Sequence, residues 1–176
     1  RSKDEREQNR AERELILVHQ PADVLKDEFN GEATASKLAR VREQMEKEEA
    51  QYHIISTLDD IAWILNVRGN DIPHVPVVLS FLVIGKEDAM WFVEENALSD
   101  AVKEMAAECG ITIRPYEDVY AYAATIPEHS TVLLDKRKVN YRITNALSET
   151  VHIVSKANPS QLMKAIKNEI ELENTR

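Results

Sequence analysis

The residues best suited to chemistry lie in one short segment, residues 66–76, with the sequence NVRGNDIPHVP. Two prolines stiffen this segment, and Gly69 permits an unusual turn beside the preceding arginine. A rigid loop of this kind can present polar groups to a ligand or a partner. The alternative is a loop that satisfies itself, with Arg68 paired to Asp71, and the pattern favours neither. The candidate side chains are a guanidinium, an amide, a carboxylate and an imidazole, from Arg68, Asn70, Asp71 and His74.

The other reactive side chains are dispersed along the chain. No H-E-x-x-H or H-x-H arrangement occurs among the five histidines, so the sequence predicts no local metal site. His53 and His152 fall in expected strands, where a hydrogen-bonded sheet histidine is the simpler interpretation. Cys109 falls on the apolar side of an expected helix, which favours a buried, inert thiol.

Two pairs of adjacent carboxylates, Asp59–Asp60 and Glu94–Glu95, are also explained without catalysis. Adjacent residues on a helix point apart, so neither pair forms a site by its spacing alone. The first pair suits the start of a helix, where negative charge is favourable. The second suits a solvated turn.

Glycine spacing excludes several enzyme classes. The chain has 4 glycines, and the closest two, Gly69 and Gly85, are 16 positions apart. Dinucleotide-binding loops, P-loops and nucleophile elbows each need several close glycines, because the backbone must bend sharply or approach a phosphate without a Cβ in the way. None of these motifs is present.

Length and charge restrict the class of molecule further. With 176 residues, 43% of them hydrophobic, the chain is long enough for one domain with a packed core. Acidic residues outnumber basic ones by 31 to 22, and this net charge of −9 argues against nucleic acid or an anionic membrane as the main partner. The single cysteine cannot form an internal disulfide, and no apolar run approaches the ~20 residues of a membrane-spanning helix. We therefore expect a soluble, cytoplasmic protein.

Hydrophobic periodicity predicts an α/β fold. Thr34 is the expected N-cap of the first helix, and residues 23–32 and 66–76 are expected connections. The alternation of elements, with one hairpin, predicts a mixed β-sheet of about six strands flanked by helices. Helices are expected at 34–45, 58–65, 98–109, 117–125, 139–147 and from 158 onward, and strands at 51–56, 77–84, 90–93, 111–114, 131–135 and 151–155.

Apolar stripes on the first and last expected helices indicate which faces are buried. The first stripe holds Arg42 as its only charged member, and the last helix begins with Pro159 at its first position. The members of the two stripes are Ala35, Leu38, Val41, Arg42 and Met45, and then Leu162, Ile166 and Ile170.

Residues 56–85, STLDDIAWILNVRGNDIPHVPVVLSFLVIG, resemble the second N-terminal domain of three-domain Xaa-Pro aminopeptidases of the creatinase/prolidase type. The segments 29–45 and 155–176 resemble, in the same order and spacing, the parts that lead into that domain and onward to the catalytic domain. The resemblance covers about residues 28–176. Its most specific element is the leucine-asparagine-x-arginine-glycine-x-aspartate run at 65–71.

This resemblance implies a function for the parent protein and the absence of the catalytic residues from this chain. Members of the family hydrolyse the bond between an N-terminal residue and a following proline. They use two metal ions, usually manganese, held in a C-terminal "pita-bread" domain by two aspartates, a histidine and two glutamates. The chain is expected to end where that domain would begin, so no catalytic or metal-ligating residue is carried over to it.

The resemblance also implies a place for the polar loop. In related enzymes the N-terminal domain shapes the entrance to the active site, often that of the partner subunit in a homodimer. The candidates for contact with the substrate end are therefore Arg68, Asn70, Asp71 and His74.

Three segments are expected: a charged N-terminal segment and connection (1–32), a creatinase N-terminal-like domain (33–157) and a linker helix (158–176). Two functions stay open. One is a substrate-gating domain of the peptidase, whose partners are its own catalytic domain, a second subunit and a proline-containing peptide. The other is a stand-alone binding module without peptidase activity. A stand-alone domain would bury the last apolar stripe against itself, whereas a linker helix would present it to the next domain.

Overall fold

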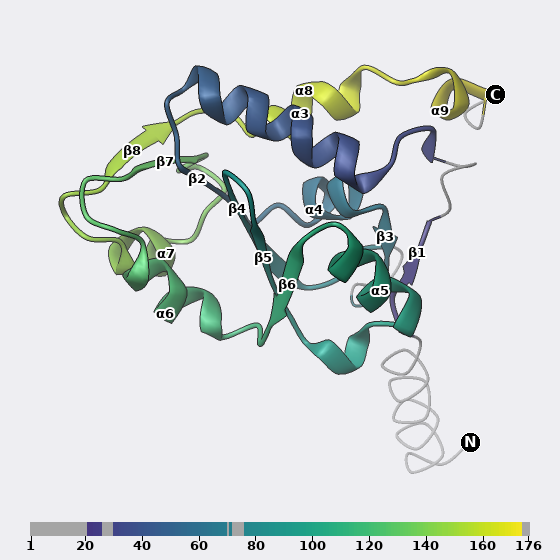
Figure 1. The fold of residues 1–176 in the computed structure, drawn as a ribbon, viewed down its shortest axis with the longest axis horizontal. Helices are drawn as coiled ribbons and strands as arrows, with labels where there is room; N and C mark the ends of the chain where they lie inside the picture. Colours follow the sequence, from purple (N-terminus) through teal and green to yellow (C-terminus); the bar gives the residue numbers. More distant parts are fainter. Residues whose placement is uncertain (1–20, 26–29, 70, 72–75, 174–176) are drawn as a thin grey trace, which may run out of the picture.

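The computed structural model describes residues 21–25, 30–69, 71 and 76–173, and Figure 1 shows their arrangement. The expectations for residues 1–20 lie outside this part of the chain. In chain order the elements are β1 (Asp23–Val24), α3 (Thr34–Lys47), β2 (Tyr52–Ile55), α4 (Leu58–Leu65), β3 (Val67–Arg68), β4 (Ser80–Gly85), β5 (Ala89–Val93), η1 (Glu95–Ala97), α5 (Asp100–Glu108), β6 (Ile111–Arg114), α6 (Asp118–Thr125), β7 (Thr131–Leu134), α7 (Tyr141–Ala146), β8 (His152–Ser155), α8 (Pro159–Ala165) and α9 (Glu169–Glu173).

A six-stranded mixed sheet forms the centre, in the order β6-β5-β4-β2-β7-β8. Strand β4 pairs antiparallel with both β2 and β5, whereas β5–β6, β2–β7 and β7–β8 are parallel pairs. The hairpin predicted between β4 and β5 is present, closed by a hydrogen bond from the Gly85 N–H to the Asp88 carbonyl oxygen at 2.9 Å. The predicted fold class, a mixed sheet of about six strands flanked by helices, is confirmed.

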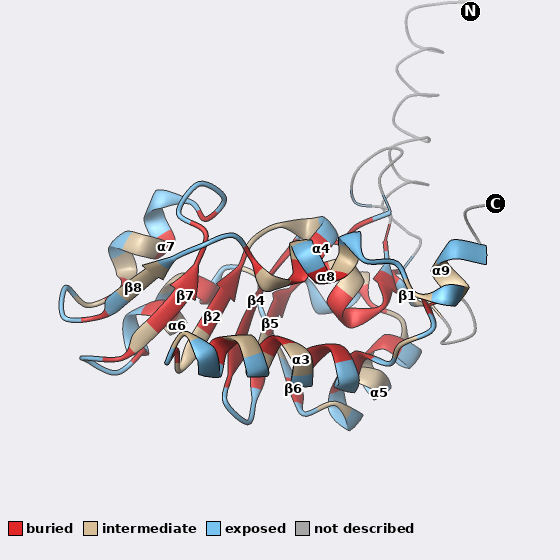
Figure 2. Cartoon of the chain, turned by 90° about the horizontal axis from the view of Figure 1, so that it is seen from above, coloured by how far each residue is buried: buried red, intermediate tan, exposed pale blue. Residues whose placement is uncertain are grey.

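Helices cover both faces of this sheet, so its central strands are buried on both sides (Figure 2). Along β2, Ile54 packs with α6 and α7 on one face, and Ile55 packs with α3, α4 and α5 on the other. Successive side chains on a strand point to opposite faces, so a strand between two helical layers must be apolar at every position. This explains why β4 has the nearly continuous apolar sequence SFLVIG.

The first helix differs from its predicted pattern at three positions. Ala33, not Thr34, occupies the N-cap position, and Thr34 is the first helical residue. Ala35 is exposed, whereas Lys37 is buried among the core residues of this face. Arg42 supports the hairpin, because its guanidinium donates to the carbonyl oxygens of Gly85 and Asp88, both at 3.0 Å.

Two expectations about connections are wrong. Residues 23–32 and 66–76 contain the short strands β1 and β3, which pair with each other in a second, two-stranded sheet. The helix expected from residue 158 onward is two helices, because residues 166–168 interrupt it. Asn168 accepts a hydrogen bond from the Glu171 N–H at 2.9 Å, and Glu171 accepts one from the Asn168 N–H at 3.0 Å. This reciprocal capping starts a new helix at α9.

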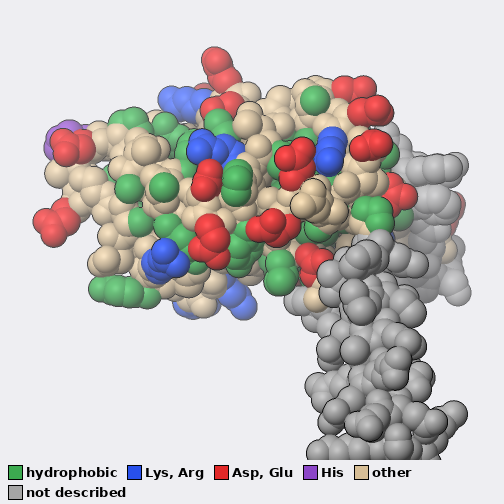
Figure 3. Space-filling model, turned by 90° about the horizontal axis from the view of Figure 1, so that it is seen from below, with side chains coloured by type: hydrophobic (Ala, Val, Ile, Leu, Met, Phe, Trp, Pro, Cys, Tyr) green, Lys and Arg blue, Asp and Glu red, His purple; other side chains and the backbone are tan. Residues whose placement is uncertain are grey.

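One face of the molecule shows how charged side chains are distributed on it. On the face shown in Figure 3, acidic side chains are interspersed with basic and apolar ones. Within the described residues, no helix combines the length and apolar character needed to cross a membrane.

The histidine and cysteine expectations are met in different degrees. His53 is fully buried in β2, with its Nδ1 2.9 Å from the Leu133 carbonyl oxygen, which confirms a hydrogen-bonded sheet histidine. His152, by contrast, is exposed on the edge strand β8, and Cys109 is half-buried against the core. Burial lowers the pKa of His53 to about 4, against the opposing effects of the Leu133 carbonyl and of Asp60.

The buried His53 makes stability depend on pH. Its pKa is below the ordinary 6.5 in the folded state, so the unfolded chain binds more protons as pH falls. We expect neutral His53 to contribute about 3 kcal/mol to the free energy of unfolding. This contribution should be complete above pH ~6.5 and should be lost progressively as pH falls toward 4. Urea unfolding across this range measures the slope. His53→Gln should flatten it, while His152→Gln at the exposed position should not, and equal slopes in both variants would contradict the assignment.

Candidate functional site

Arg68 is positioned by the end of α4. Asn66, which follows that helix, adopts the left-handed conformation (φ 53°), which asparagine tolerates better than most residues. This turns the chain into β3, where Arg68 pairs with Asp23 of β1. The turn is fixed by a hydrogen bond from the Leu25 N–H to the Asn66 carbonyl oxygen at 2.7 Å. The Arg68 side chain is consequently held on a short, paired strand and is exposed.

Asp71 closes the loop that follows. Its carboxylate accepts a hydrogen bond from the Leu79 N–H at 2.8 Å, and its own N–H donates to the Val77 carbonyl oxygen at 3.3 Å. Gly69 is required here, because a Cβ at that position would lie 2.9 Å from the Val77 carbonyl oxygen and 2.5 Å from Val78. The loop is therefore held partly by Asp71.

Arg68 and Asp71 form no ion pair with each other among the described residues. The loop is thus not closed in the way that the self-satisfied alternative proposed. The other two predicted site residues, Asn70 and His74, lie outside the described part of the chain.

Arg68 lines a groove of about 620 Å³ between β3, α4 and the segment that joins α8 to α9. Apolar side chains form much of its wall, and the basic side chains of Lys164, on α8, and Lys167, in the joining segment, lie along one side. The lining residues are Leu25, Asn30, Asp59, Ala62, Trp63, Asn66, Val67, Arg68, Pro76, Val77, Lys164, Lys167 and Glu171.

Lys164 joins α8 to the start of α4. Its ammonium group contacts Asp59 and donates to Asp60 at 3.0 Å, so the adjacent carboxylates expected to point apart converge on one cation. Burial alone would raise the pKa of Asp59, but the hydrogen bond and charge of Lys164 hold it below its usual range. Burial alone would lower the pKa of Lys164, but the hydrogen bonds and charges of Asp59 and Asp60 raise it above its usual value. Asp60 is buried and also accepts hydrogen bonds from Thr57 at 2.5 Å and Asn158 at 3.2 Å.

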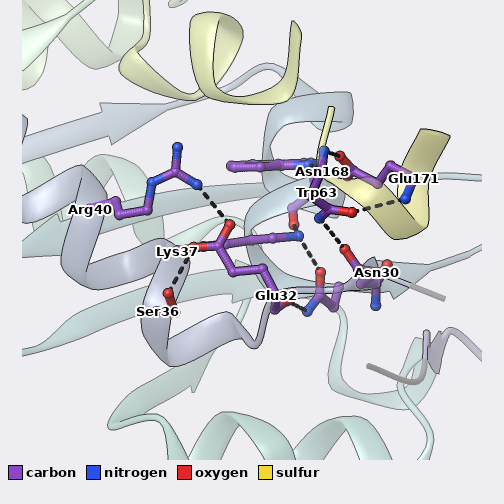
Figure 4. A network of polar contacts seen from close by, with 9 residues as sticks. Asn30, Glu32, Ser36, Lys37, Arg40, Trp63, Asn168 and Glu171 are labelled. Atoms are coloured by element: carbon purple, nitrogen blue, oxygen red, sulfur yellow. Dashed lines mark hydrogen bonds and ion pairs between the residues drawn. The ribbon is translucent and has the colours of Figure 1, made fainter. Parts of the chain in front are cut away.

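A second lysine, Lys37, is buried at 1% exposure beneath the same region (Figure 4). Its ammonium donates to the Trp63 carbonyl oxygen at 2.9 Å and to Asn66 Oδ1 at 2.6 Å, and it lies 4.2 Å from the centre of the Trp63 ring. Asn66 Nδ2 in turn donates to the Glu32 carbonyl oxygen at 2.8 Å. The Glu32 carboxylate accepts from Ser36 and Arg40, both at 2.7 Å. Lys37 thereby fixes the residue that turns the chain toward Arg68.

Near this network, residues close to the start of the described chain contact residues close to its end. We call this contact the terminal clasp, and it consists of Asn30, Trp63, Asn168 and Glu171 (Figure 4). Trp63 Nε1 donates to Glu171 Oε1 at 3.2 Å, and Asn168 Nδ2 donates to the Asn30 carbonyl oxygen at 2.7 Å. Gly31 (φ 69°) lies so close that a Cβ there would be 2.8 Å from Asn168 Oδ1. The clasp forms one wall of the groove that holds Arg68.

Residues 16–171 match the family described as the creatinase/prolidase N-terminal domain. The chain belongs to this family. The match includes the polar loop, the buried lysine network and the terminal clasp, so the site described above is part of a creatinase/prolidase N-terminal domain.

The chain is similar in sequence to several Xaa-Pro aminopeptidases. A probable Xaa-Pro aminopeptidase P from Neurospora crassa is 35% identical over 166 residues, covering 89% of this chain and 24% of the relative. Xaa-Pro aminopeptidase 1 from Dictyostelium discoideum is 37% identical over 149 residues, covering 85% of this chain and 23% of the relative. The chain spans about a quarter of the length of these relatives.

Solved structures agree on the fold. The X-prolyl aminopeptidase of Caenorhabditis elegans, described as a cytosolic enzyme with a di-nuclear active site, matches with a TM-score of 0.79 and 26% identity, over 88% of this chain and 26% of that one. The aminopeptidase P from Streptococcus thermophilus matches with a TM-score of 0.53 and 12% identity, over 74% of this chain and 98% of that one. The second likeness concerns the fold alone.

A dinuclear metal centre does not fit the described residues of this domain. Nowhere in the described ranges do three His, Cys, Asp or Glu side chains come together in a way that could hold a metal ion. The carboxylate pair Asp59–Asp60 instead holds the ammonium group of Lys164.

Sequence reasoning missed Lys37, Trp63, Asn168 and Glu171. Lys37 lies one position before Leu38 of the apolar stripe, and its acceptors come from residues 26 and 29 positions later in the chain. The asparagine and glutamate three residues apart at 168 and 171 match a capping-box pattern, which could have been recognised.

The terminal clasp yields a test. Trp63→Phe removes the Nε1 donor but keeps an aromatic face beside Lys37. This hydrogen bond is long, at 3.2 Å, and only part-buried, so its loss should cost about 1 kcal/mol. We therefore expect amide hydrogen exchange of residues 169–173 to accelerate about fivefold. The matched control is Glu173→Gln, an exposed position on the same helix, which should leave the exchange unchanged. Identical exchange in Trp63→Phe and the unsubstituted chain would show that the clasp does not hold α9.

Proposed function

We propose that this chain is a non-catalytic domain of a metal-dependent Xaa-Pro aminopeptidase and that its polar loop shapes access of the peptide to the active site. The observation that carries the proposal is its similarity to Xaa-Pro aminopeptidases over most of its own length but only about a quarter of theirs. The parent protein would hydrolyse the bond between an N-terminal residue and a following proline. Its catalytic residues and two divalent metal ions, for which we propose manganese, would lie in the remainder of the parent.

Location and assembly belong to the same proposal. The C. elegans relative is described as cytosolic, which supports a cytoplasmic parent enzyme. We propose a homodimer in which the polar loop faces its own or the partner's active site. The proposed domain limits are 33–157 for the folded unit and 158–176 for the connection to the catalytic domain.

The role of Arg68 rests on its chemistry and its support. The guanidinium is exposed at the groove, and its backbone is held by β1 and by the turn at Asn66. A guanidinium can donate two parallel hydrogen bonds to a carboxylate or one to a carbonyl oxygen. Arg68 therefore suits recognition of the substrate beyond the proline, with Asn70, Asp71 and His74 as its proposed companions. Asp71 acts by holding the loop, because its carboxylate is engaged by the Leu79 N–H.

A peptidase assay tests the first part of the proposal. This chain and the longer parent protein are compared on an Xaa-Pro peptide with added manganese. We expect turnover by the parent only, and its loss when a chelator removes the metal. Chelator-sensitive turnover proportional to the amount of the purified 176-residue chain would overturn the non-catalytic assignment.

Substitution of Arg68 in the parent enzyme tests the second part. A lost charge-assisted hydrogen bond made equally in ground and transition states raises KM without changing kcat. We expect Arg68→Ala to raise KM about tenfold with kcat little changed, and Arg68→Lys to restore part of the loss. Lys86→Ala, an exposed cation in the β4–β5 turn, is the matched control and should behave as the parent does. Unchanged kinetics and stability in Arg68→Ala would remove Arg68 from the site.

A further inference from the structure

Helix α8 contacts the domain with one side and leaves an apolar side uncovered. Met163 is 9% exposed and belongs to the core, and Ser160 is fully buried. Leu162 on α8 and Ile166, the residue that directly follows the helix, are 69% and 68% exposed. Among the large apolar side chains of the described residues, Tyr141 alone is more open to solvent than these two.

The exposed pair borders a groove of about 680 Å³ between α3 and α8. Leu133 at the end of β7 and Met163 of α8 contribute apolar surface inside it. Pro159, Leu162, Ala165 and Ile166 also line the groove. Much of the wall formed by α8 is therefore apolar.

The basic side chains around this groove already have partners. Lys156 lies 2.6 Å from Glu48, and Arg40 lies 2.7 Å from Glu32. Of the side chains that line the groove, Arg40 and Lys156 are matched in number by Glu43 and Glu48. The groove is therefore balanced in charge, which suits the apolar side chains of a polypeptide better than a charged small ligand.

We propose that the α3–α8 groove, with Leu162 and Ile166, receives an apolar segment of the parent chain from the portion by which the relatives exceed this domain. The relatives are about four times as long as the matched region, so most of their chain is available for such a contact. A segment tethered to the same polypeptide docks at a high effective concentration, so even a groove of this size can be occupied stably. This inference rests on the proposed function only in that the domain forms part of a longer protein.

Thiol labelling tests the proposal. Leu162→Cys and Ile166→Cys place a reactive group at the groove, and Tyr141→Cys is the matched control, since Tyr141 is 80% exposed on α7 at a distance from α3 and α8 (Figure 1). Each variant is made in the 176-residue chain and in the parent, and labelling of Cys109 in the unsubstituted protein is subtracted. In the 176-residue chain we expect all three positions to react with a maleimide at similar rates. In the parent, labelling at 162 and 166 should slow at least tenfold, and labelling at 141 should not.

Dilution separates the possible occupants. Protection that is independent of the parent's concentration supports docking within one polypeptide. Protection that is lost on dilution, or that already occurs in the 176-residue chain, would assign the groove to a second copy and overturn the proposal. Equal labelling rates at all positions in the parent would also overturn it. Because the assay reads accessibility, protection in a parent without Xaa-Pro peptidase activity would refute the proposed function and leave the groove assignment standing.

Discussion

The buried ammonium group of Lys37 constrains the whole region around the candidate site. A charge removed from water costs several kcal/mol unless its environment satisfies every donor. Here the acceptors are the Trp63 carbonyl oxygen, near the end of α4, and the side chain of Asn66 just beyond it. The last carbonyl groups of a helix lack partners within it and lie at the negative end of its dipole, so a lysine there is doubly favourable. The end of α4, the turn at Asn66 and the direction of β3 are consequently determined together.

Lys164 balances a buried negative charge at the other end of α4. The first turn of that helix carries Asp59 and Asp60, and the second of these is almost fully buried. Lys164 supplies the countercharge from α8, more than one hundred positions later in the chain. One helix is therefore held at both ends by lysines from different elements, α3 and α8. The placement of α8, and with it the apolar side that it leaves exposed, follows from a charge requirement at α4.

The sequence was sufficient to predict the helices and strands whose apolar residues recur at a regular spacing. Alternation of strands and helices predicted the six-stranded sheet, and the apolar strands β2 and β4 are where period and composition are strongest. Strands β1 and β3 were missed because two residues are too few to show a period, and their pairing depends on the turn at Asn66.

The candidate site was predictable only in part. Arg68 and Asp71 were proposed as site residues from their types, but the partner of the Asp71 carboxylate is the backbone of Leu79, which residue types do not reveal. Lys37 was overlooked because a lysine normally marks a solvated position, and its burial depends on distant acceptors. The last helix was predicted as one unit because Leu162, Ile166 and Ile170 fit a helical spacing, although the cap at Asn168 interrupts it.

The terminal clasp also determines how this domain would respond to force. Strand β1 and helix α9 lie at the same end of the molecule, and Asn30 and Asn168 are joined directly by a hydrogen bond (Figure 1). The residues between them form a loop closed by that contact. Tension applied through neighbouring parts of a longer chain would therefore load the clasp and the short β1–β3 pair before it reached the six-stranded sheet. These few hydrogen bonds would break first under tension, so that the ends of the domain would open while its core stayed folded.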